Sequence, residues 1–393
     1  MKVLIVHNAY QNPGGEDVVF DQERRLLERE GHRVSVYRRS NWEMDHAVGL
    51  TRLMLVPNTV WNSRSRQEIS KLLSQERPDV VHVHNTFIMI SPSIFSACRE
   101  AGVPVVQTLH NYRLFCPAAL FFRKGKVCEE CLQHSLWRGI RYGCYRDSSA
   151  ETAVVALMLA VNRSRGTWTE GVDRFVTLTE SSRQKFVAAG LPAEKVGVKP
   201  NFVHPDPGAR AEGGDYAAFV GRLSPEKGVM TLLAAWSQLR TPIPLSILGG
   251  GPQQEELQVR ADALHLAGVR FEGQVKRELT IAAIKGARFL VFPSEWYEIF
   301  PVTIAEAFAC GTPIICSRLG SMQELVEDGR TGLHFTPGDP EDLARKVEWA
   351  WAHPEKMWKM GKEARREYEA KYTAEKNYPM LIETYRAAMA ARG

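Results

Sequence analysis

Short apolar, β-branched runs recur along the chain, with stretches of helical periodicity between them. In the first half they cover residues 3–7, 33–38, 80–84, 103–109 and 175–179, and in the second half residues 217–220, 245–248, 269–272, 289–293 and 313–316. Strands that alternate with helices in this way form βαβ units, in which a parallel sheet has helices on both faces. The pattern predicts an α/β protein made of two Rossmann-like, doubly wound domains.

Residues 200–214 separate the two sets of runs and are rich in proline and glycine without periodicity. Such composition is typical of a surface linker. We therefore predict an N-terminal domain over residues 1–204 and a C-terminal domain over residues 205–372. Residues 373–393 are helical in pattern, and we expect them to return to the first domain.

The composition is that of an ordinary folded protein. The 393 residues are 44% hydrophobic and 24% charged, which excludes disordered and collagen-like classes. No apolar run reaches the roughly 18 residues that a membrane span needs, and the opening apolar stretch is too short for a signal peptide. We expect a cytoplasmic protein with reduced thiols.

The net charge of +5 divides into +7 for residues 1–200 and −2 for residues 201–393. The first half is therefore the part expected to meet an anionic partner, either a membrane surface or a phosphorylated substrate. Nucleic acid is not expected, because basic residues form no long block and no nucleic-acid-binding motif is present. A mixed, evenly solvated surface explains the same charges equally well.

Three histidines come at or just after the ends of predicted strands in the first domain: His7, His84 and His110. Ligands of open parallel sheets bind at the carboxyl ends of the strands. We expect the three side chains to face a cleft between the domains, because three equivalent positions favour function over chance.

A strand, a loop and a helix are predicted within residues 294–317. Pro301 suits the first position of a helix, since its φ is fixed and its missing N–H is not needed there. The free amides of Val302 and Thr303 would then present partial positive charge to an anion such as phosphate.

Two glutamates flank this helix start. Glu306 lies on the face below the free amides, where it suits neutral hydroxyls such as a ribose diol beside the phosphate. Glu298 would contact the group on the other side of the phosphate. The alternative is that both are ordinary carboxylates near the start of a helix.

A second element, FVGRLSPEKG, runs from a strand through a turn into a helix and contains Arg222 and Lys227. Two cations at the carboxyl end of the strand would neutralise a departing diphosphate without a metal. Surface arginine and lysine are common, so these two cations alone do not indicate a binding site. Together with the predicted helix start near Glu298 they indicate a diphosphate site.

These motifs resemble those of the family 4 retaining glycosyltransferases, which have the GT-B fold. Glu298 and Glu306, with seven residues between them, precede GTPIICSRLGSMQELVEDGRTGLHF in the manner of the family signature. GRLSPEKG, LGGGPQQEEL and FEGQV match further landmarks in order, and QNPGGEDVV matches the amino-terminal glycine loop. The resemblance covers nearly the whole chain.

The resemblance implies two domains that face a central cleft, with the acceptor on the first and a nucleotide-diphosphate sugar on the second. It implies that Arg222 and Lys227 hold the diphosphate, that Glu298 grips the transferred sugar and that His110 lies near the anomeric carbon. The residues that it places around the donor are Gly14, Gly15, Gly250, Gln274, Val275, Ile299, Phe300, Pro301, Val302, Thr303 and Glu306. Family members often have glycine where this chain has Ile299, so a narrower sugar pocket is expected.

The expected activity is sugar transfer to a hydroxyl, on a sugar or lipid-linked acceptor, in polysaccharide or glycoconjugate synthesis. A front-face reaction with retention at the anomeric carbon suits a site without a carboxylate dyad, and it needs no divalent cation. A sugar-nucleotide epimerase and a non-catalytic sugar-nucleotide binding protein are the alternatives. NAD(P) is disfavoured, because the first βα turn lacks G-x-G-x-x-G and the second strand ends without an acidic residue.

Four of the seven cysteines fall within a predicted insertion, residues 111–147. Cys116, Cys128, Cys131 and Cys144 are spaced by eleven, two and twelve residues. One C-x-x-C with two flanking cysteines suits a tetrahedral, structural Zn²⁺. A chance cluster of four reduced thiols is the alternative.

Basic and apolar residues also mix in residues 41–66. The members of this group are Leu50, Arg52, Leu53, Met54, Leu55, Trp61, Arg64 and Arg66. Such a surface would lie at the inner face of a membrane, where a lipid-linked acceptor is available. Packing within the first domain explains the same apolar residues equally well.

Overall fold

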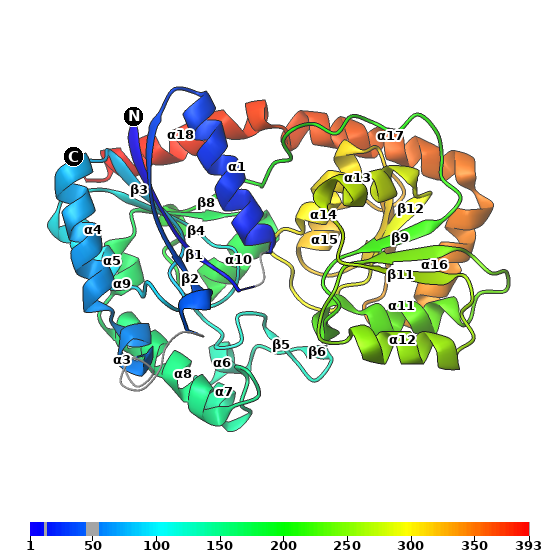
Figure 1. Cartoon of the computed structure of the whole chain (residues 1–393), viewed down its shortest axis with the longest axis horizontal. Coiled ribbons are helices and arrows are strands. Elements are labelled where there is room, and N and C mark those ends of the chain that lie inside the picture. Colours follow the sequence, from blue (N-terminus) through cyan, green and yellow to red (C-terminus); the bar gives the residue numbers. More distant parts are fainter. Residues whose placement is uncertain (12–13, 45–54, 393) are drawn as a thin grey trace. The chain divides into compact units, whose positions relative to one another are not determined.

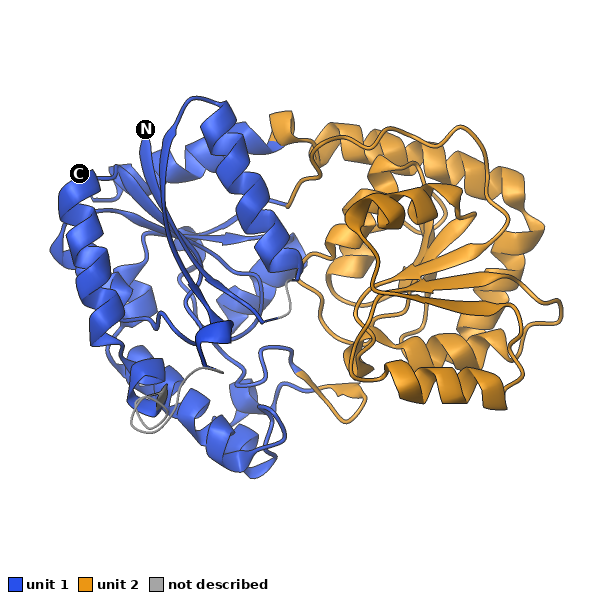
Figure 2. Ribbon diagram, viewed as in Figure 1, with its two compact units in different colours: residues 1–121, 128–200, 377–393 blue, residues 122–127, 201–376 orange. Residues whose placement is uncertain are grey.

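The computed structural model describes residues 1–11, 14–44 and 55–392. The chain divides into two compact units, shown in different colours in Figure 2. The first unit contains residues 1–121, 128–200 and 377–393, and the second contains residues 122–127 and 201–376. Each unit is an α/β structure with a parallel sheet, as the sequence predicts.

The sheet of the first unit has six parallel strands in the order β2-β1-β3-β4-β7-β8. Their bounds are Lys2–Ala9 for β1, Arg33–Ser40 for β2, Val80–Asn85 for β3, Val105–Thr108 for β4, Arg174–Thr177 for β7 and Val196–Val198 for β8. Val3, Leu4, Ile5 and Val6 of β1 are all buried. Such unbroken burial is typical of a parallel strand that is covered on both faces.

Helices connect these strands, as Figure 1 shows. They are α1 (Gly15–Arg29), α3 (Leu55–Val60), α4 (Ser63–Glu76), α5 (Ile94–Glu100), α8 (Ser149–Ser164), α9 (Thr167–Gly171) and α10 (Glu180–Ala188). The insertion between β4 and α8 contains only short elements: β5 (Phe122–Arg123), β6 (Lys126–Val127), α6 (Glu130–Gln133) and α7 (Trp137–Arg141).

The last helix, α18 (Ala374–Ala390), returns to the first unit. The Tyr385 hydroxyl lies 2.8 Å from His82 Nδ1 of β3, and the Tyr378 hydroxyl lies 2.9 Å from His32 Nε2. Arg392 forms a 2.8 Å ion pair with Asp173. Contacts between residues 219 to 346 positions apart thus close the first unit.

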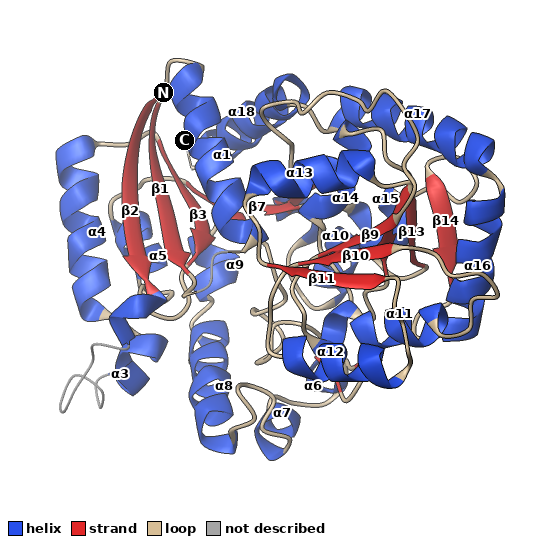
Figure 3. Ribbon diagram, turned by 45° about the vertical axis from the view of Figure 1, so that its right-hand side comes forward, coloured by secondary structure: helices blue, strands red, loops and turns tan. Residues whose placement is uncertain are grey.

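The sheet of the second unit also has six parallel strands, in the order β11-β10-β9-β12-β13-β14. Their bounds are Ala217–Val220 for β9, Leu245–Leu248 for β10, Val269–Gly273 for β11, Phe289–Phe292 for β12, Ile314–Ser317 for β13 and Gly332–Phe335 for β14. One face packs against α11 (Val229–Trp236), α12 (Gln254–Ala263) and α16 (Pro340–Ala352). The other packs against α13 (Arg277–Gly286), α14 (Val302–Ala309) and α17 (Pro354–Lys371), as Figure 3 shows.

The unit boundaries differ by a few residues from the predicted ones, which were 204/205 and 372/373, and residues 122–127 of the insertion predicted for the first domain belong to the second unit. Phe202 and Val203 belong to the second unit, where the Val203 N–H donates to the Tyr372 carbonyl. The return to the first unit begins at Asn377, whose side chain donates to the Pro200 carbonyl. Packing partners, rather than the proline-rich composition, therefore set the boundary.

Candidate functional site

Glycines line the carboxyl end of the sheet in the second unit. Gly249, after β10, has a φ of +132°, and a Cβ there would lie 1.9 Å from the Gly221 carbonyl oxygen. Only glycine fits such an approach of two backbone segments. The Leu223 N–H donates to the Gly250 carbonyl at 3.0 Å, which joins the loops after β9 and β10.

Two of the residues expected around the donor base are neighbours in this region. A Cβ at Gly250 would lie 3.9 Å from the Gln274 Cβ, in the loop after β11. Gln274 is exposed and Val275 is half-buried. The structure therefore brings Gly250 and Gln274 together at an open surface.

Lys227 and Glu298 form an ion pair at the same end of the sheet. Lys227 Nζ lies 2.6 Å from Glu298 Oε1. The same oxygen accepts hydrogen bonds from Ser294 Oγ at 2.7 Å and Trp296 Nε1 at 2.9 Å. The Oε2 oxygen has no hydrogen-bond partner among the described residues. Glu298 is thus fixed through one oxygen and leaves the other for a ligand.

The turn that holds Lys227 is constrained by its own backbone. Residues Pro225–Lys227 form a single 3₁₀ turn, and Gly228 follows with a φ of +69°. A Cβ at Gly228 would lie 2.0 Å from the Pro293 carbonyl oxygen at the end of β12. A side chain at position 228 would push this turn away from Glu298. Lys227 Nζ also lies over two aromatic rings, 5.6 Å from the ring centroid of Phe292 and 5.5 Å from that of Trp296.

Arg222, the second predicted cation, is exposed in the loop after β9. Within the described part of the chain its side chain forms no hydrogen bond and no ion pair. Its backbone carbonyl accepts from the Ser224 N–H. Arg222 therefore offers a full positive charge, whereas the charge of Lys227 is already balanced by Glu298.

Helix α14 begins one residue later than predicted. Pro301 has a ψ of 107° and is the N-cap, so Val302 is the first helical residue. No side chain caps the helix, and the Ile304 N–H donates to the Pro301 carbonyl. The amides of Val302 and Thr303 are thus not bonded by a cap, while Ile299 and Phe300 before them are buried.

Glu306, in the second turn of α14, has a partner that the sequence did not predict. Its Oε1 lies 3.3 Å from Arg277 Nε of α13. Burial raises the pKa of Glu306, and the charge and hydrogen bond of Arg277 oppose that increase. Arg277 stands in no motif, so no sequence signal pointed to it.

The first unit contains a buried polar network around Glu23 of α1. Glu23 Oε1 lies 2.5 Å from Lys199 Nζ, and Glu23 Oε2 lies 3.4 Å from His84 Nε2 and 3.6 Å from His82 Nδ1. Burial pushes the pKa of Glu23 upward, but the Lys199 ammonium and then His84 hold it well below its usual value. Glu23 is therefore ionised.

Glu23, His82 and His84 are also the one described group of three or more ligand-type side chains whose atoms lie within 4.8 Å of one another. The Lys199 ammonium is already in contact with the Glu23 carboxylate. Burial, followed by the charge of His84, holds the pKa of His82 well below its usual value. A cation next to Lys199 would be repelled, so the group fits an ion-pair network better than a metal site.

His110 connects to this network through His84. His110 Nε2 lies 3.0 Å from His84 Nδ1, and the two rings are stacked. Burial, followed by the His84 charge, lowers the pKa of His110 well below its usual value. His110 is thus a neutral imidazole that is held by a neighbour.

His7 differs from the expectation that it faces a ligand. It is fully buried, stacks on Phe20 with ring centroids 4.6 Å apart, and lies 3.0 Å from Asp17 Oδ1 through Nε2. Strand β1 continues to Ala9, so His7 lies inside the strand and not at its end. His84 is buried as well, one residue before the end of β3.

The predicted glycine loop begins α1. Gly14 is the N-cap and Gly15 the first helical residue, and the Gly14 N–H donates to Asp17 Oδ2 at 2.8 Å. Next to it, Glu16 Oε2 accepts from Asn111 Nδ2 at 3.4 Å. Burial, followed by the charge of Asp17, raises the pKa of Glu16 to about 8. Protonation of Glu16 at neutral pH removes one negative charge from this helix start.

The four insertion cysteines share one neighbourhood in the first unit. Burial, followed by the nearby thiols of Cys116, Cys144 and Cys128, raises the pKa of Cys131 to about 12. Cys116 is buried and the other three are partly buried. No three of their sulfur atoms lie within 4.8 Å of one another.

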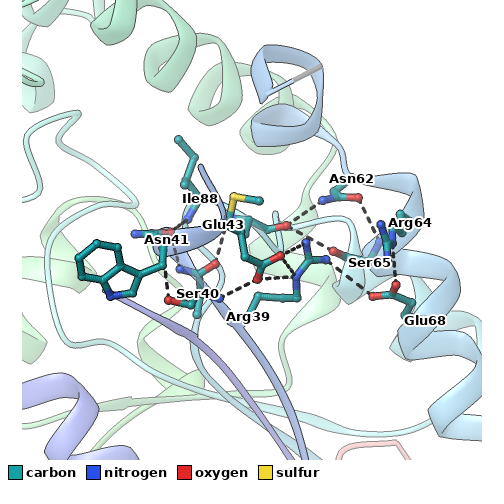
Figure 4. Close-up of polar contacts among 12 residues, drawn as sticks. Arg39, Ser40, Asn41, Glu43, Asn62, Arg64, Ser65, Glu68 and Ile88 are labelled. Carbon is teal, nitrogen blue, oxygen red and sulfur yellow. Dashed lines mark hydrogen bonds and ion pairs between the residues drawn. The ribbon is translucent and has the colours of Figure 1, made fainter. Parts of the chain in front are cut away.

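The segment suggested for membrane contact is only partly described. Leu50, Arg52, Leu53 and Met54 lie outside the described residues. Arg64 Nε donates to Glu68 at 2.8 Å, and Arg39 pairs with Glu43, as Figure 4 shows. Arg66 pairs with Glu100 at 2.5 Å. The Glu68 and Glu100 carboxylates reduce the positive charge that the segment would offer to a membrane. No helix in the described ranges is long and apolar enough to cross one.

Comparison with known proteins gives two family matches. Residues 13–207 match the model described as Glycosyltransferase Family 4, and residues 203–367 match Glycosyl transferases group 1. D-rhamnosyltransferase WbpZ of Pseudomonas aeruginosa is 35% identical over 158 residues, which are 40% of this chain and 41% of that protein. The chain thus matches less than half the length of this relative.

Solved structures share the fold over the full length. Sucrose-phosphate synthase of Thermosynechococcus elongatus has a TM-score of 0.74 at 19% identity, with 99% of both chains covered. HepE of Anabaena, solved with UDP, has a TM-score of 0.68 at 19% identity, with 98% of this chain and 100% of that one covered. Each half of the chain thus matches a glycosyltransferase family model, and the chain as a whole has the GT-B fold of these solved structures.

Proposed function

We propose that the protein is a retaining glycosyltransferase that moves a sugar from a nucleotide-diphosphate donor to a hydroxyl acceptor. The observation that supports this best is the arrangement at the carboxyl end of the second sheet. Lys227 and Glu298 are paired there through one carboxylate oxygen, and Arg222 in the same loop has an unpaired charge. Such a surface suits a ligand that has both an anionic group and neutral hydroxyls.

The two ends of the donor have separate partners in this proposal. Arg222, Lys227 and the uncapped start of α14 bind the diphosphate, and Glu306 accepts hydrogen bonds from the ribose. Gly250, Gln274 and Val275 bound the base. Glu298 Oε2, with the backbone of residues 299–302, holds the transferred sugar.

In the reaction, the bond between the anomeric carbon and the diphosphate oxygen breaks, and the electron pair stays on that oxygen. Arg222, Lys227 and the helix start stabilise the charge that develops there. The acceptor hydroxyl attacks from the same face, and its proton passes to the departing phosphate oxygen. The positive groups of the chain thus supply the stabilisation that a divalent cation supplies in other enzymes.

His110 has a positioning role near the anomeric carbon. Its Nε2 lies against His84, so its orientation is set from within the first unit. A neutral imidazole accepts or donates one hydrogen bond without placing a second positive charge beside a carbon that becomes positive during transfer. This role rests on the family resemblance and on the low pKa of His110.

The acceptor is a sugar or a lipid-linked sugar in polysaccharide or glycoconjugate synthesis, at the inner face of the membrane. The relatives support sugar transfer from a nucleotide donor, since WbpZ is named a D-rhamnosyltransferase and HepE was solved with UDP. The excess of basic residues in residues 1–200 is the feature of this chain that agrees with an anionic surface.

The test is a transfer assay with a panel of uridine, guanosine and adenosine diphosphate sugars and a panel of glycan and lipid-linked acceptors. Acceptor-dependent release of the nucleoside diphosphate is the expected result, and NMR of the product should show the anomeric configuration of the donor. Activity should persist without Mg²⁺ or Mn²⁺. Conversion of the donor to its epimer, binding without turnover, or an inverted product would each overturn the proposal.

A further inference from the structure

The cysteine-rich segment, residues 128–147, has almost no hydrophobic core. Gly139 and Gly143 are its only buried residues, and neither has a side chain to bury. Its helices, α6 and α7, have four and five residues. Helices of this length are not stable alone in water, and their order must come from other contacts.

The backbone around this segment also holds unfavourable conformations. Five of the eight described non-glycine residues with positive φ are Ala119, Phe121, Lys124, Arg146 and Asp147. Each such residue costs about 1 kcal/mol or more and persists only when its surroundings fix it. A segment without a core that also contains strained residues requires a cross-link of another kind.

Three of the segments that carry the cysteines meet at Gly139. A Cβ at Gly139 would lie 3.4 Å from Cys131 Sγ and 3.1 Å from Cγ of Pro117, the residue after Cys116. The Cys144 N–H donates to the Gly139 carbonyl at 3.1 Å. Cys128 lies in the same C-x-x-C as Cys131, and all three other thiols are electrostatic neighbours of the Cys131 thiol.

We propose that Cys116, Cys128, Cys131 and Cys144 bind one Zn²⁺ in a closed, structural site. Four thiolates complete a tetrahedral shell and leave no position for water or substrate, so the metal takes no part in sugar transfer. Each thiol loses its proton as its sulfur–zinc bond forms, and four protons are released. The ion thus cross-links the loop after β4, the C-x-x-C turn and the end of α7.

Binding requires the four sulfurs to approach one another. Zinc–sulfur bonds of about 2.3 Å place the sulfurs of a tetrahedral site about 3.8 Å apart. In the structure, no three of the four sulfur atoms lie within 4.8 Å of one another. Neutral thiols attract one another weakly, so the metal itself supplies the energy for this contraction.

A cation next to the cluster favours the resulting charge. A zinc ion with four thiolates has a net charge of −2, and the Arg163 guanidinium is an electrostatic neighbour of the Cys131 sulfur. Arg163 is itself held by a 2.6 Å hydrogen bond to the Leu114 carbonyl. The C-x-x-C turn is fixed from its other side, where Glu129 forms a 2.5 Å ion pair with Lys185 of α10.

The remaining cysteines provide matched controls. Cys98, Cys310 and Cys316 are fully buried in regular elements of the two units or directly beside them. A free thiol that is buried in this way acts as a small hydrophobic group. They contribute nothing to a metal site.

The experiment measures zinc in the full chain, purified without a metal-affinity tag, added zinc or chelator. About one zinc per chain is expected in the unmodified protein and in Cys98→Ala, and less than a tenth of that in Cys131→Ser and Cys128→Ser. A mercurial reagent that reacts with thiols should release the zinc of the unmodified protein in one step, followed with a chromogenic chelator. This second measurement does not depend on whether the variants fold.

A wild-type protein without stoichiometric zinc would overturn the proposal, whether it shows seven free thiols, a disulfide within the cluster by mass spectrometry, or iron in place of zinc. Retention of full zinc by both serine variants would overturn the assigned ligands. Sugar transfer is not needed for any of these readouts, so failure here and failure of the proposed function are distinguishable.

Discussion

The lysine–glutamate pair Lys199–Glu23 of the first unit and the pair Lys227–Glu298 of the second unit differ in their surroundings. Lys199 and Glu23 are 2.5 Å apart, with side chains 1% and 0% exposed. Lys227 and Glu298 are 2.6 Å apart, with side chains 19% and 7% exposed. The chemistry and distance are nearly the same, so the surroundings must decide what each pair does.

The partners of each carboxylate show the difference. Both oxygens of Glu23 face groups of the first unit, namely Lys199 on one side and His82 and His84 on the other. Glu298 receives three donors on one oxygen, and its second oxygen has no partner in the described ranges. A pair enclosed in this way stabilises the fold, whereas a pair with an open oxygen beside an exposed Arg222 is arranged for a ligand.

Breaking the enclosed pair should have the largest effect. In Glu23→Gln the Lys199 ammonium stays buried without a counter-charge, and we expect a loss of about 3–5 kcal/mol in the free energy of unfolding. Urea denaturation measures this. The double variant Glu23→Gln/Lys199→Met removes both charges and should recover part of the loss. A loss below about 1 kcal/mol in the single variant would mean that the pair does not stabilise the core.

Breaking the open pair should reduce activity instead. Lys227→Met is expected to lower kcat by about 10²–10³-fold, the effect of removing one group that stabilises developing charge. Glu298→Gln should also lower kcat, because the transferred sugar then loses the carboxylate that holds it. The free energy of unfolding should fall by only about 1 kcal/mol, because the Lys227 side chain of the pair is partly exposed to solvent. Exposed Lys359 of α17 gives the matched control Lys359→Met, which should keep full activity. If Lys227→Met or Glu298→Gln lost as much stability as Glu23→Gln, the Lys227–Glu298 pair would be structural in the same way as Lys199–Glu23.

The start of α1 should make stability depend on pH, because Glu16 titrates near neutral pH. Its pKa in the folded protein is about 8, above the usual value, so the folded state keeps a proton that the unfolded state has lost. Stability should therefore fall as pH rises from about 4.5 to 8 and then level off. Thermal midpoints of Glu16→Gln should lack this part of the slope. An identical pH dependence in both proteins would show that Glu16 does not titrate there.

Much of the fold could be predicted, because its signals are local. The strand at residues 217–220 is a continuous apolar run and that at 245–248 is interrupted only by Ser246, and the structure has strands at the same positions. Two short strands, β8 and β14, escaped prediction because each contains a glycine within three or four residues. Glycine weakens the strand signal that side chains provide.

The candidate site could be predicted only as far as its motifs reach. Lys227 and Glu298 lie in recognisable segments, although their direct pairing across 71 residues was not foreseen. Glu23 and its partner Lys199 are separated by even more of the sequence, 176 positions. His7 was misplaced because β1 extends two residues beyond the predicted end. Such contacts depend on the folded topology, which periodicity does not encode.

Substitution of Arg277, the partner of Glu306, should have the smallest effect on activity. Arg277 lies 3.3 Å from Glu306 and its side chain is 37% exposed, so this ion pair is more exposed to solvent than Lys199–Glu23 and Lys227–Glu298. If Glu306 binds a ribose, Arg277 keeps its carboxylate ionised and oriented without touching the reacting atoms. Arg277→Gln should therefore raise the KM for the donor by roughly 3–10-fold, about 1 kcal/mol, and leave kcat nearly unchanged. Arg277→Lys keeps the charge and should recover part of the affinity. A fall in kcat at unchanged KM would instead connect Arg277 to the transition state, and Glu306 would then need a role other than ribose binding.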